Sequence, residues 1–557
     1  MNLAPGNLPS SRTVMFNREI DVQNLKELQD LPEKRREGRA QEIRSGVNFL
    51  QRAPRFPANR RCVDLPWVIL FLLTVLALIV FSATSIDDLQ KQSAEPAEPR
   101  VLAFQGDVDG YEPVQYVDDG FGGSPDPSYD APISSGDGAP FERDGPNGVE
   151  NIHLSKSQAK HLILAVSLAG IAGAFGGLIS ASLWILAAKT CASAVVYTSL
   201  YTVPSIIVLV GIVLLVAGSV QGGLICCLVG VLLFTLVMWC WARYIPFTIE
   251  VAQMVAAAFS ENLEMVAISA FGGLLGPIWV ILVVVAYAAC ELKLTGNLSD
   301  GEGKESSDAF YPFFFVCVWG SGVIQNICHV AYCGVFSRWY YEEEGAPLLK
   351  SLQVALGTSF GSICQGTLII AAISTVETAV RSSRRQAQQD GNMVGCVISL
   401  VLECFLSCIG DLMEYFNQWV FVLCAIRGGT FCDSVKGTCA MISCSGMKAV
   451  IGDLLIDRVV MLGSILSAIA GAGLAALAAC LAATDAGQQL SKADIIGLCS
   501  LLGSLTGLIS GGGVMGIMSS GTKAILMCWA EDPDRLHQDH GFEDVHEELS
   551  NKAREWK

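Results

Sequence analysis

The chain has 557 residues, of which 52% are hydrophobic and 16% are charged, and its mean hydropathy of +0.47 lies far above that of a soluble domain. The formal net charge is −17, and because no extended basic face accumulates along the chain, a nucleic-acid-binding protein is excluded. Hydrophobic runs of about 20 residues, long enough to cross a bilayer as helices, predict an all-α, polytopic membrane protein.

About ten such runs follow one another, and most of them crowd residues 160–526. They lie near residues 65–84, 162–188, 195–219, 222–243, 264–290, 310–336, 355–380, 393–426, 457–483 and 495–520. A chain that crosses a bilayer this often is typical of a transporter, a channel or a lipid-handling enzyme. The polar groups inside the runs therefore bear most directly on function.

Basic residues cluster directly before the first run, at Arg52, Arg55, Arg60 and Arg61. By the positive-inside rule they place the amino terminus in the cytosol, so the acidic segment after the first run lies outside. That segment is rich in Gly, Asp, Pro and Ser, which predicts a largely irregular loop. The predicted parts are a cytosolic arm at 1–64, the first transmembrane helix at 65–84, the acidic extracytosolic loop at 85–157, the transmembrane helical bundle at 158–526 and a cytosolic acidic tail at 527–557.

Two loops carry further signals for topology. The loop 291–309 contains the glycosylation acceptor sequence Asn297-Leu298-Ser299, so we expect Asn297 to be glycosylated outside the cell. The segment after the seventh run carries Arg381, Arg384 and Arg385, although strict alternation places it outside. Either the positive-inside rule is violated locally, or residues 393–426 are not a simple single crossing.

The sixth run carries a polar stripe. Trp319, Asn326 and His329 recur at helical spacing, and Gln325 lies beside them. These groups are costly against lipid, so we expect them to face the bundle interior or a water-filled cavity. Two interpretations stay open, namely a satisfied cluster of hydrogen bonds between helices and a lining for a polar or cationic solute.

The seventh run carries Ser362 and Gln365, which we expect on the opposite side of the same cavity. It also contains Gly357-Thr358-Ser359-Phe360-Gly361, formally the G-x-S-x-G pattern of a serine hydrolase. That pattern requires a strand–turn–helix context, which an apolar spanning helix does not offer. We therefore expect no enzyme.

Carboxylates occur at membrane depth in the eighth run, as Asp411 and Glu414. Such groups are neutral, paired or functional, because a charged acid is costly there. One interpretation pairs them with Arg427 or Lys436 at the cytosolic interface. The other makes them candidates for proton coupling or for the attraction of a cation.

Small residues and histidines give weaker signals. Glycines interrupt several runs, for example Gly276 and Gly512, and they favour either close helix packing or broken helices that expose the backbone to a solute. His537, His540 and His546 in the tail match no strong metal-binding template. We expect neither a metal nor a cofactor.

Five short blocks follow one another between residues 61 and 533. They are Arg61-Cys62-Val63-Asp64; Trp319, Gln325-Asn326, His329-Val330, Gly334 and Trp339-Tyr340; Ser359-Phe360-Gly361-Ser362-Ile363-Cys364-Gln365-Gly366; Glu414, Phe416-Asn417, Ala425-Ile426, Gly428 and Phe431-Cys432; and Cys528-Trp529-Ala530-Glu531-Asp532-Pro533. In this order they resemble the choline transporter-like proteins, a family of solute carriers. The chain departs from that pattern at Trp419-Val420 and at Lys523, where relatives more often have an acidic or neutral residue.

The resemblance implies a ten-helix carrier of the plasma membrane, with both termini cytosolic, that transports choline or a related small organic cation such as ethanolamine. Choline carries a permanent positive charge, and an aromatic face attracts such a charge by about 0.5–2 kcal/mol. Trp319 is the expected ring. An inside-negative potential contributes about 2.3 kcal/mol per charge per 100 mV to uptake.

Two other classes of protein remain alternatives. A channel or a membrane scaffold is one, although no filter sequence or ring-forming repeat is found. A membrane enzyme of lipid metabolism is the other, although no paired Asp/Arg phosphotransferase motif is found. The expected partners are the small cation and the lipid bilayer, with no nucleic acid.

Overall fold

The computed structural model describes residues 33–57, 60–94, 156–295, 309–343, 347–445, 448–482 and 492–532. Within these ranges the regular structure is entirely helical, so the predicted all-α polytopic fold is confirmed. The α-helices are α3 (Glu33–Arg52), α4 (Leu65–Ala94), α5 (Lys156–Val216), α6 (Val220–Leu236), α7 (Ile245–Glu261), α8 (Met265–Thr295), α9 (Phe310–Tyr340), α10 (Pro347–Gln353), α11 (Phe360–Gln389), α12 (Met393–Arg427), α13 (Phe431–Ser445), α14 (Lys448–Ala482) and α15 (Lys492–Glu531).

Eight of the described helices are long and apolar enough to cross a membrane. Most of the predicted hydrophobic runs lie within single helices, but two of them, 162–188 and 195–219, share the 61-residue α5, and the run 355–380 begins in the π-helical turn Val354–Thr358 before α11. Cys191 has non-helical backbone angles (φ −128°, ψ 41°) and marks a kink between the two halves of α5. The run at 222–243 begins in the shorter α6, which has 17 residues.

Helix α7 was not predicted. Its 17 residues fall between two hydrophobic runs, and many of their side chains are buried, among them Val251, Val255 and Phe259. Helix α4 likewise continues to Ala94, beyond the predicted end of the first span.

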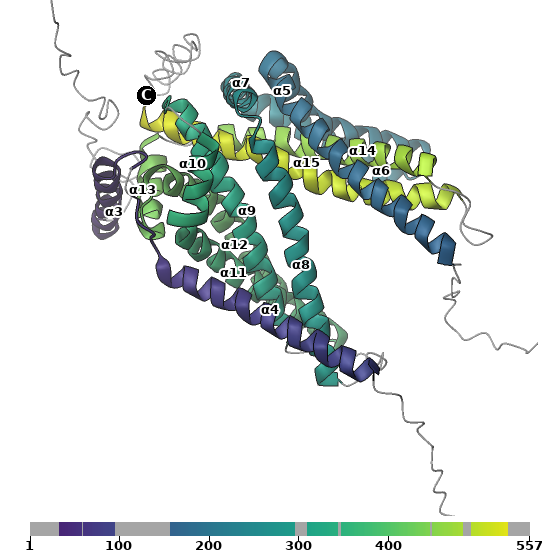
Figure 1. Cartoon of the computed structure of the whole chain (residues 1–557). Helices are drawn as coiled ribbons and strands as arrows, with labels where there is room; N and C mark the ends of the chain where they lie inside the picture. The colour runs from purple at the N-terminus through teal and green to yellow at the C-terminus, as the bar shows by residue number, and fades with distance from the viewer. Residues whose placement is uncertain are drawn as a thin grey trace, which may run out of the picture.

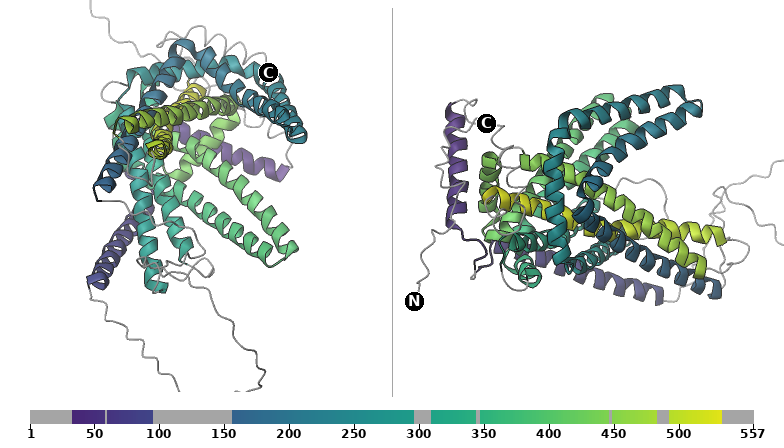
Figure 2. Two further views of the ribbon diagram at one scale, coloured as in Figure 1. Left: turned by 90° about the vertical axis from the view of Figure 1, so that its right-hand side faces the viewer. Right: turned by 90° about the horizontal axis from the view of Figure 1, so that it is seen from above.

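The long helices form two groups that meet at one end and diverge toward the other. Helices α5, α6, α14 and α15 make up one group, and α4, α8, α9, α11 and α12 make up the other (Figure 1). Helices α3, α10 and α13 and the carboxyl end of α15 lie where the groups meet (Figure 1). The two further views show the same divergence, with the α11–α12 hairpin projecting as an arm (Figure 2). We call the shared end the closed end.

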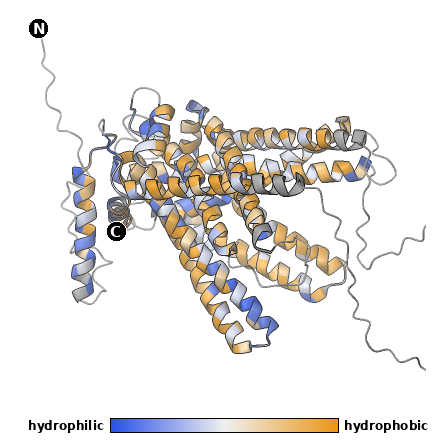
Figure 3. Ribbon diagram, turned by 60° about the horizontal axis from the view of Figure 1, so that its bottom comes forward, coloured by the Kyte–Doolittle hydropathy of each residue, from blue (hydrophilic) through white to orange (hydrophobic). Residues whose placement is uncertain are grey.

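The surface character of the helices follows this arrangement. The long helices are mostly hydrophobic, whereas α3 beside the closed end is largely hydrophilic (Figure 3). Helix α3 packs on α13 and buries Ile43 and Leu50. Residues before the first span, after α9 and at the end of α15 thus lie at one end, as expected for segments on the same side of a membrane.

The three helices α5, α14 and α15 pack through a seam of small residues. A Cβ atom added to Gly507 would lie 2.7 Å from the carbonyl oxygen of Ser467 and 2.9 Å from the Cα of Gly471. Backbone atoms cannot yield to such a side chain, so glycine is required here for close approach. We call Gly471, Gly503, Gly507 and Ser467 the glycine seam.

The arginines after the seventh run are paired. Arg381 and Arg384 each place Nε within 2.8 Å of a Glu403 carboxylate oxygen, and Arg381 also contacts Glu377 at 2.8 Å. Helices α11 and α12 have 30 and 35 residues, about 45 and 52 Å at about 1.5 Å per residue, whereas a bilayer core is about 30 Å thick. Since residues 393–427 form one continuous helix, this segment is long enough for a single crossing, and under the predicted alternation Arg381 and Arg384 would be a local exception to the positive-inside rule.

Candidate functional site

A cavity of about 680 Å³ lies where the two helix groups meet, between α8, α9, α12 and α15. Helix α9 contributes Gln325, Asn326 and His329, three of the predicted site residues. Helix α15 contributes Ser519 and Ser520. The cavity is therefore walled by both helix groups, and its polar side chains come from both.

Glycines create the space of this large cavity. Gly273 and Gly276 of α8 and Gly512 and Gly516 of α15 all line it, and no atom lies within 4 Å of where their Cβ atoms would be. These glycines are not packing contacts, in contrast to those of the glycine seam. Their missing side chains leave room for a solute between two long helices.

His329 connects three helices at the wall of the cavity. Its Nδ1 lies 2.8 Å from the hydroxyl oxygen of Ser520 on α15, and its Nε2 lies 2.9 Å from the carbonyl oxygen of Gln418 on α12. A carbonyl only accepts, so Nε2 carries a proton that it donates to Gln418, and this pattern suits the neutral Nε2–H tautomer. His329 is thus a hydrogen-bonded interhelical residue that also lines the cavity, and its contact with a solute stays a prediction.

A second cavity of about 290 Å³ lies between α9, α11 and α12. Gln325 and Asn326 line both cavities and stand between them. Asn326 donates from Nδ2 to the carbonyl oxygen of Gly322, 2.8 Å away on its own helix. The second cavity is lined by Glu414 and by Asn417, whose Oδ1 atom is buried and has no hydrogen-bond partner among the described residues.

Asp411 and Glu414 are both exposed on α12, and neither forms the ion pairs considered from the sequence. Arg427 is bonded to Glu531 instead, and Lys436 lies 3.8 Å from Asp433. Of the two interpretations, pairing at the cytosolic interface is therefore not the observed arrangement. Glu414 instead is among the residues that line the second cavity.

Trp319 lines neither of these two cavities. Its side chain is 2% exposed, its Nε1 donates to the carbonyl oxygen of Cys364 at 3.1 Å, and its ring meets that of Phe71 edge-on at 5.2 Å between centroids. Trp319 therefore joins α9 to α4 and α11, although its neighbours Val318 and Ser321 line the second cavity.

Ser362 and Gln365 also lie apart from both cavities. Ser362 donates its hydroxyl to the Asp64 carboxylate at 2.6 Å, and that carboxylate also accepts from the backbone N–H of Phe431 at 2.8 Å. Gln365 lies beside Cys432, with its Nε2 4.0 Å from Sγ. Asp64 thus fastens the start of α4 to α11 and α13, so these predicted site residues occupy a structural junction.

The closed end is held by charged groups whose pairing with one another was not predicted. Arg55 and Arg427 both bond the carboxylate of Glu531, the former at 2.7 Å. Tyr340 donates its hydroxyl to the carbonyl oxygen of Asp532 at 2.8 Å. Arg60, which donates to the carbonyl oxygens of residues 425 and 426 at 2.8 and 2.9 Å, has its pKa lowered to about 10 by burial and then by the charge of Arg338.

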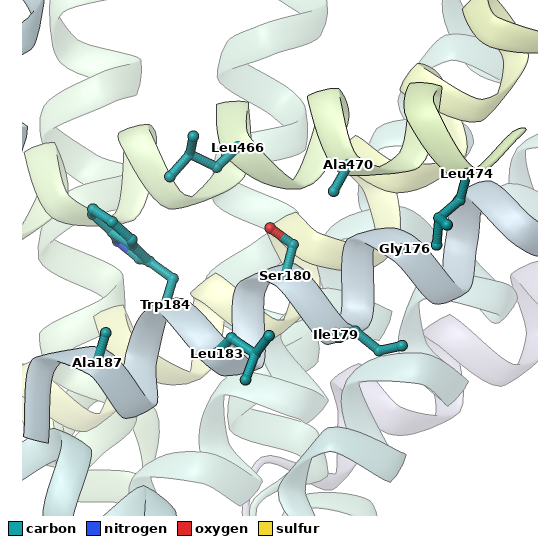
Figure 4. Close-up of a pocket in the computed structure, with 9 residues that line it drawn as sticks. All are labelled: Gly176, Ile179, Ser180, Leu183, Trp184, Ala187, Leu466, Ala470 and Leu474. Carbon is teal, nitrogen blue, oxygen red and sulfur yellow. The ribbon is translucent and has the colours of Figure 1, made fainter. Parts of the chain in front are cut away.

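A groove of about 390 Å³ between α5 and α14 is different in character. Figure 4 shows Trp184 and Ser180 of α5 facing Leu466 of α14 across it. Its other lining residues are apolar or glycine, and Ile179 and Leu183 are more than half exposed. The groove offers no set of polar groups for a charged solute.

Some predicted features lie outside the residues that the structure describes. These are the acceptor Asn297, most of the acidic loop 85–157, and the tail histidines His537, His540 and His546. Within the described ranges, no group of three or more His, Cys, Asp or Glu side chains could hold a metal ion.

Comparison with known proteins points to one family. A family model described as "Plasma-membrane choline transporter" matches residues 225–534, a segment that includes every residue lining the two cavities. The chain is 27% identical over 312 residues to Protein PNS1 of Gibberella zeae, with 54% of this chain and 57% of the relative covered. It is 26% identical over 293 residues to a CTL-like protein of Dictyostelium discoideum, covering 51% of each. The matched part thus spans about half the length of these curated relatives.

Proposed function

We propose, from the premise that this chain belongs to the choline transporter-like family, that it is a carrier for a small organic cation such as choline or ethanolamine. The family model covers more than half of the chain, and the chain is a multi-pass membrane protein. The observation that carries the proposal is the large cavity between the two helix groups, with Gln325, Asn326 and His329 on its wall. We further propose the plasma membrane as its location, following the description of the family model.

The arrangement of the helices suits a carrier that receives its solute from outside. The two helix groups diverge away from the closed end (Figure 1), and the closed end is sealed by Arg55, Arg427 and Glu531. A carrier exposes a central site alternately to the two sides of the membrane by moving one helix group against the other. In this proposal release to the cytosol requires the contacts of Glu531 to break.

Recognition of the cation is assigned to groups at the two cavities. A quaternary ammonium has no N–H to donate, so it responds to carboxylates and aromatic faces rather than to hydrogen-bond acceptors. Glu414 offers the carboxylate and Tyr332 offers an aromatic ring at the large cavity. Gln325, between the cavities, suits the hydroxyl group of choline or ethanolamine. In this proposal Trp319 fixes the position of α9 through its contacts with α4 and α11 and does not contact the solute.

Uptake into vesicles tests this proposal. The purified full-length chain is reconstituted, an inside-negative potential is imposed, and uptake of radiolabelled choline and of radiolabelled ethanolamine is compared with protein-free vesicles. We expect saturable uptake of at least one of them. Glu414→Gln should raise the KM at matched incorporation, whereas Glu403→Gln, which alters an arginine-paired carboxylate on the same helix, should not. No uptake of either compound above the protein-free level would refute the proposed substrate class.

A further inference from the structure

Lys523 and Asp453 form an ion pair inside the membrane-spanning part of the molecule. Lys523 lies on α15 and Asp453 on α14, their Nζ and Oδ1 atoms are 3.2 Å apart, and the two side chains are 1% and 0% exposed. Desolvation of two charges commonly outweighs their attraction, and an apolar pair of the same volume is often as stable. Charged residues at membrane depth are also strongly associated with function.

The pair is not needed to hold α14 and α15 together. The glycine seam already brings these helices into backbone contact, because Cβ atoms at Gly507 and Gly471 would collide with the neighbouring backbones. Such close packing of small residues is itself a strong source of helix association in a bilayer. The ion pair therefore affects the local electrostatic potential more than it strengthens the association of α14 with α15.

The ammonium group lies one side chain behind the wall of the large cavity. Lys523 donates from Nζ to the hydroxyl oxygen of Ser519 at 2.9 Å, and Ser519 lines the cavity. Neither Lys523 nor Asp453 is itself among the lining residues. The positive charge of Lys523 thus lies next to a cavity that we assign to a cation. Asp453 is the nearest negative charge to the Lys523 ammonium.

Other charged or polarisable groups surround the pair on three helices. Asp457, one turn further along α14, is partly buried and interacts electrostatically with Lys523, and the neighbouring Arg458 is exposed. The ring of Tyr415 on α12 has its centroid 5.7 Å from Nζ. On α9, His329 contacts the hydroxyl group of Ser520, which lies three residues before Lys523 on α15. None of these groups contacts the ammonium as closely as Asp453 does.

We propose that Lys523 and Asp453 together set the electrostatic potential of the large cavity and thereby its selectivity for charge. When both residues are present, the Asp453 carboxylate neutralises the Lys523 ammonium, so a cation in the cavity experiences little repulsion. Without Asp453 the ammonium repels a cation, and without Lys523 the carboxylate attracts one. Only the identity of the transported cation in this inference rests on the proposed function.

Thiol reagents of opposite charge measure this potential directly. Cys328 lines the cavity, so its rates of modification by small cationic and anionic methanethiosulfonates can be followed by peptide mass spectrometry on the purified full-length protein. Asp453→Asn should lower the ratio of cationic to anionic rates on the order of tenfold or more, and Lys523→Met should raise it similarly, because a unit charge in a protein acts at an effective dielectric constant of about 20, well below that of water. Glu403→Gln, at the distant hairpin, should leave the ratio unchanged.

A swapped pair separates an electrostatic role from a structural one. Lys523→Asp combined with Asp453→Lys keeps a neutral pair but places the carboxylate beside Ser519, so the ratio at Cys328 should rise and choline should bind several-fold more tightly. A purely structural pair predicts wild-type values for the swapped protein, and that result would overturn the inference. If the swapped protein does not fold, Asp453→Asn and Lys523→Met test the proposal. If both variants shift the ratio of modification rates at Cys328 in the same direction, or if neither shifts it, the proposal is refuted.

The proposed cation and the proposed role of the ion pair can be refuted separately. If the ratios shift as expected while the wild type binds neither choline nor ethanolamine, the proposed cation is wrong and the role of the pair stands. If choline binds and the ratios do not shift, the proposed function stands and the role of the pair is refuted.

Discussion

Trp319 is buried, and its aromatic ring is surrounded by protein neighbours. Its Nε1 donates to Cys364 on α11, and its ring meets Phe71 of α4. Truncating a buried tryptophan removes both its packing and its hydrogen bond and leaves a cavity. Such changes cost about 3–5 kcal/mol in protein cores.

We therefore expect Trp319→Ala to lower the midpoint of thermal unfolding in detergent strongly, and Trp319→Phe to lower it less because most of the ring remains. The KM for choline of the folded fraction should stay close to that of the wild type. A higher KM at unchanged thermal stability would return Trp319 to the solute site.

Two glycines on α15 make a matched pair for testing the cavity. Gly512 faces open space, whereas a Cβ on Gly507 would meet backbone atoms of α14. We expect Gly512→Leu to reduce uptake by filling the cavity while the yield of folded protein stays unchanged. Gly507→Leu should lower that yield, as measured by size-exclusion chromatography. Full uptake by Gly512→Leu would argue against this cavity as the route.

At the scale of elements, the closed end depends on one carboxylate. Glu531 at the end of α15 holds Arg427 of α12 and Arg55 before α4, so it joins elements of both helix groups. Removing one partner of a buried pair leaves an uncompensated charge, at a cost of about 3–5 kcal/mol. Arg427 is only 4% exposed, so the closed end should loosen when Glu531 is neutralised.

Glu531→Gln should accordingly increase the rate at which a thiol reagent reaches the buried Cys528, one turn earlier on α15. We expect a rise of tenfold or more, measured by peptide mass spectrometry. Asp433→Asn serves as the control, because its pair with Lys436 is largely exposed and such pairs contribute only about 0–1 kcal/mol. Equal rates in wild type and Glu531→Gln would show that other contacts seal this end.

The long helices could be predicted from the sequence because hydropathy over about 20 residues is a local signal. Helix α7 was not predicted from hydropathy because it is shorter and lies between two longer hydrophobic runs. Helical spacing predicted that Trp319, Asn326 and His329 share the inner side of α9, and of these three Asn326 and His329 line the large cavity whereas Trp319 does not. Helical spacing shows which residues share one face of a helix, but it does not show which other helix or cavity that face meets.

The remaining site features depend on contacts between distant segments. Ser362 binds Asp64 and Lys523 pairs with Asp453, and in both cases no periodic pattern links the two residues in the sequence. A single sequence shows that Lys523 is costly at membrane depth, but not which acid balances it. Such pairings appear only when the helices are assembled.

At the scale of the whole molecule, the basic residues before α4 predict that the closed end lies on the cytosolic side of the membrane. The exposed cysteines Cys62 and Cys480 lie toward opposite ends of the described helices. In sealed cells, a membrane-impermeant thiol reagent added outside should label Cys480 and should spare Cys62 until the membrane is opened. The reverse pattern would invert the topology and the direction from which the solute enters.

The contrast between the two kinds of glycine also bears on how such a protein can diversify. Gly273, Gly276, Gly512 and Gly516 border empty space, so a mutation to alanine, serine or valine at any of them reshapes the cavity without disturbing a packed interface. A single nucleotide change converts any glycine codon to an alanine or a valine codon. New cargo preferences can therefore arise during evolution in one step and without compensating changes, while the glycine seam keeps the scaffold constant.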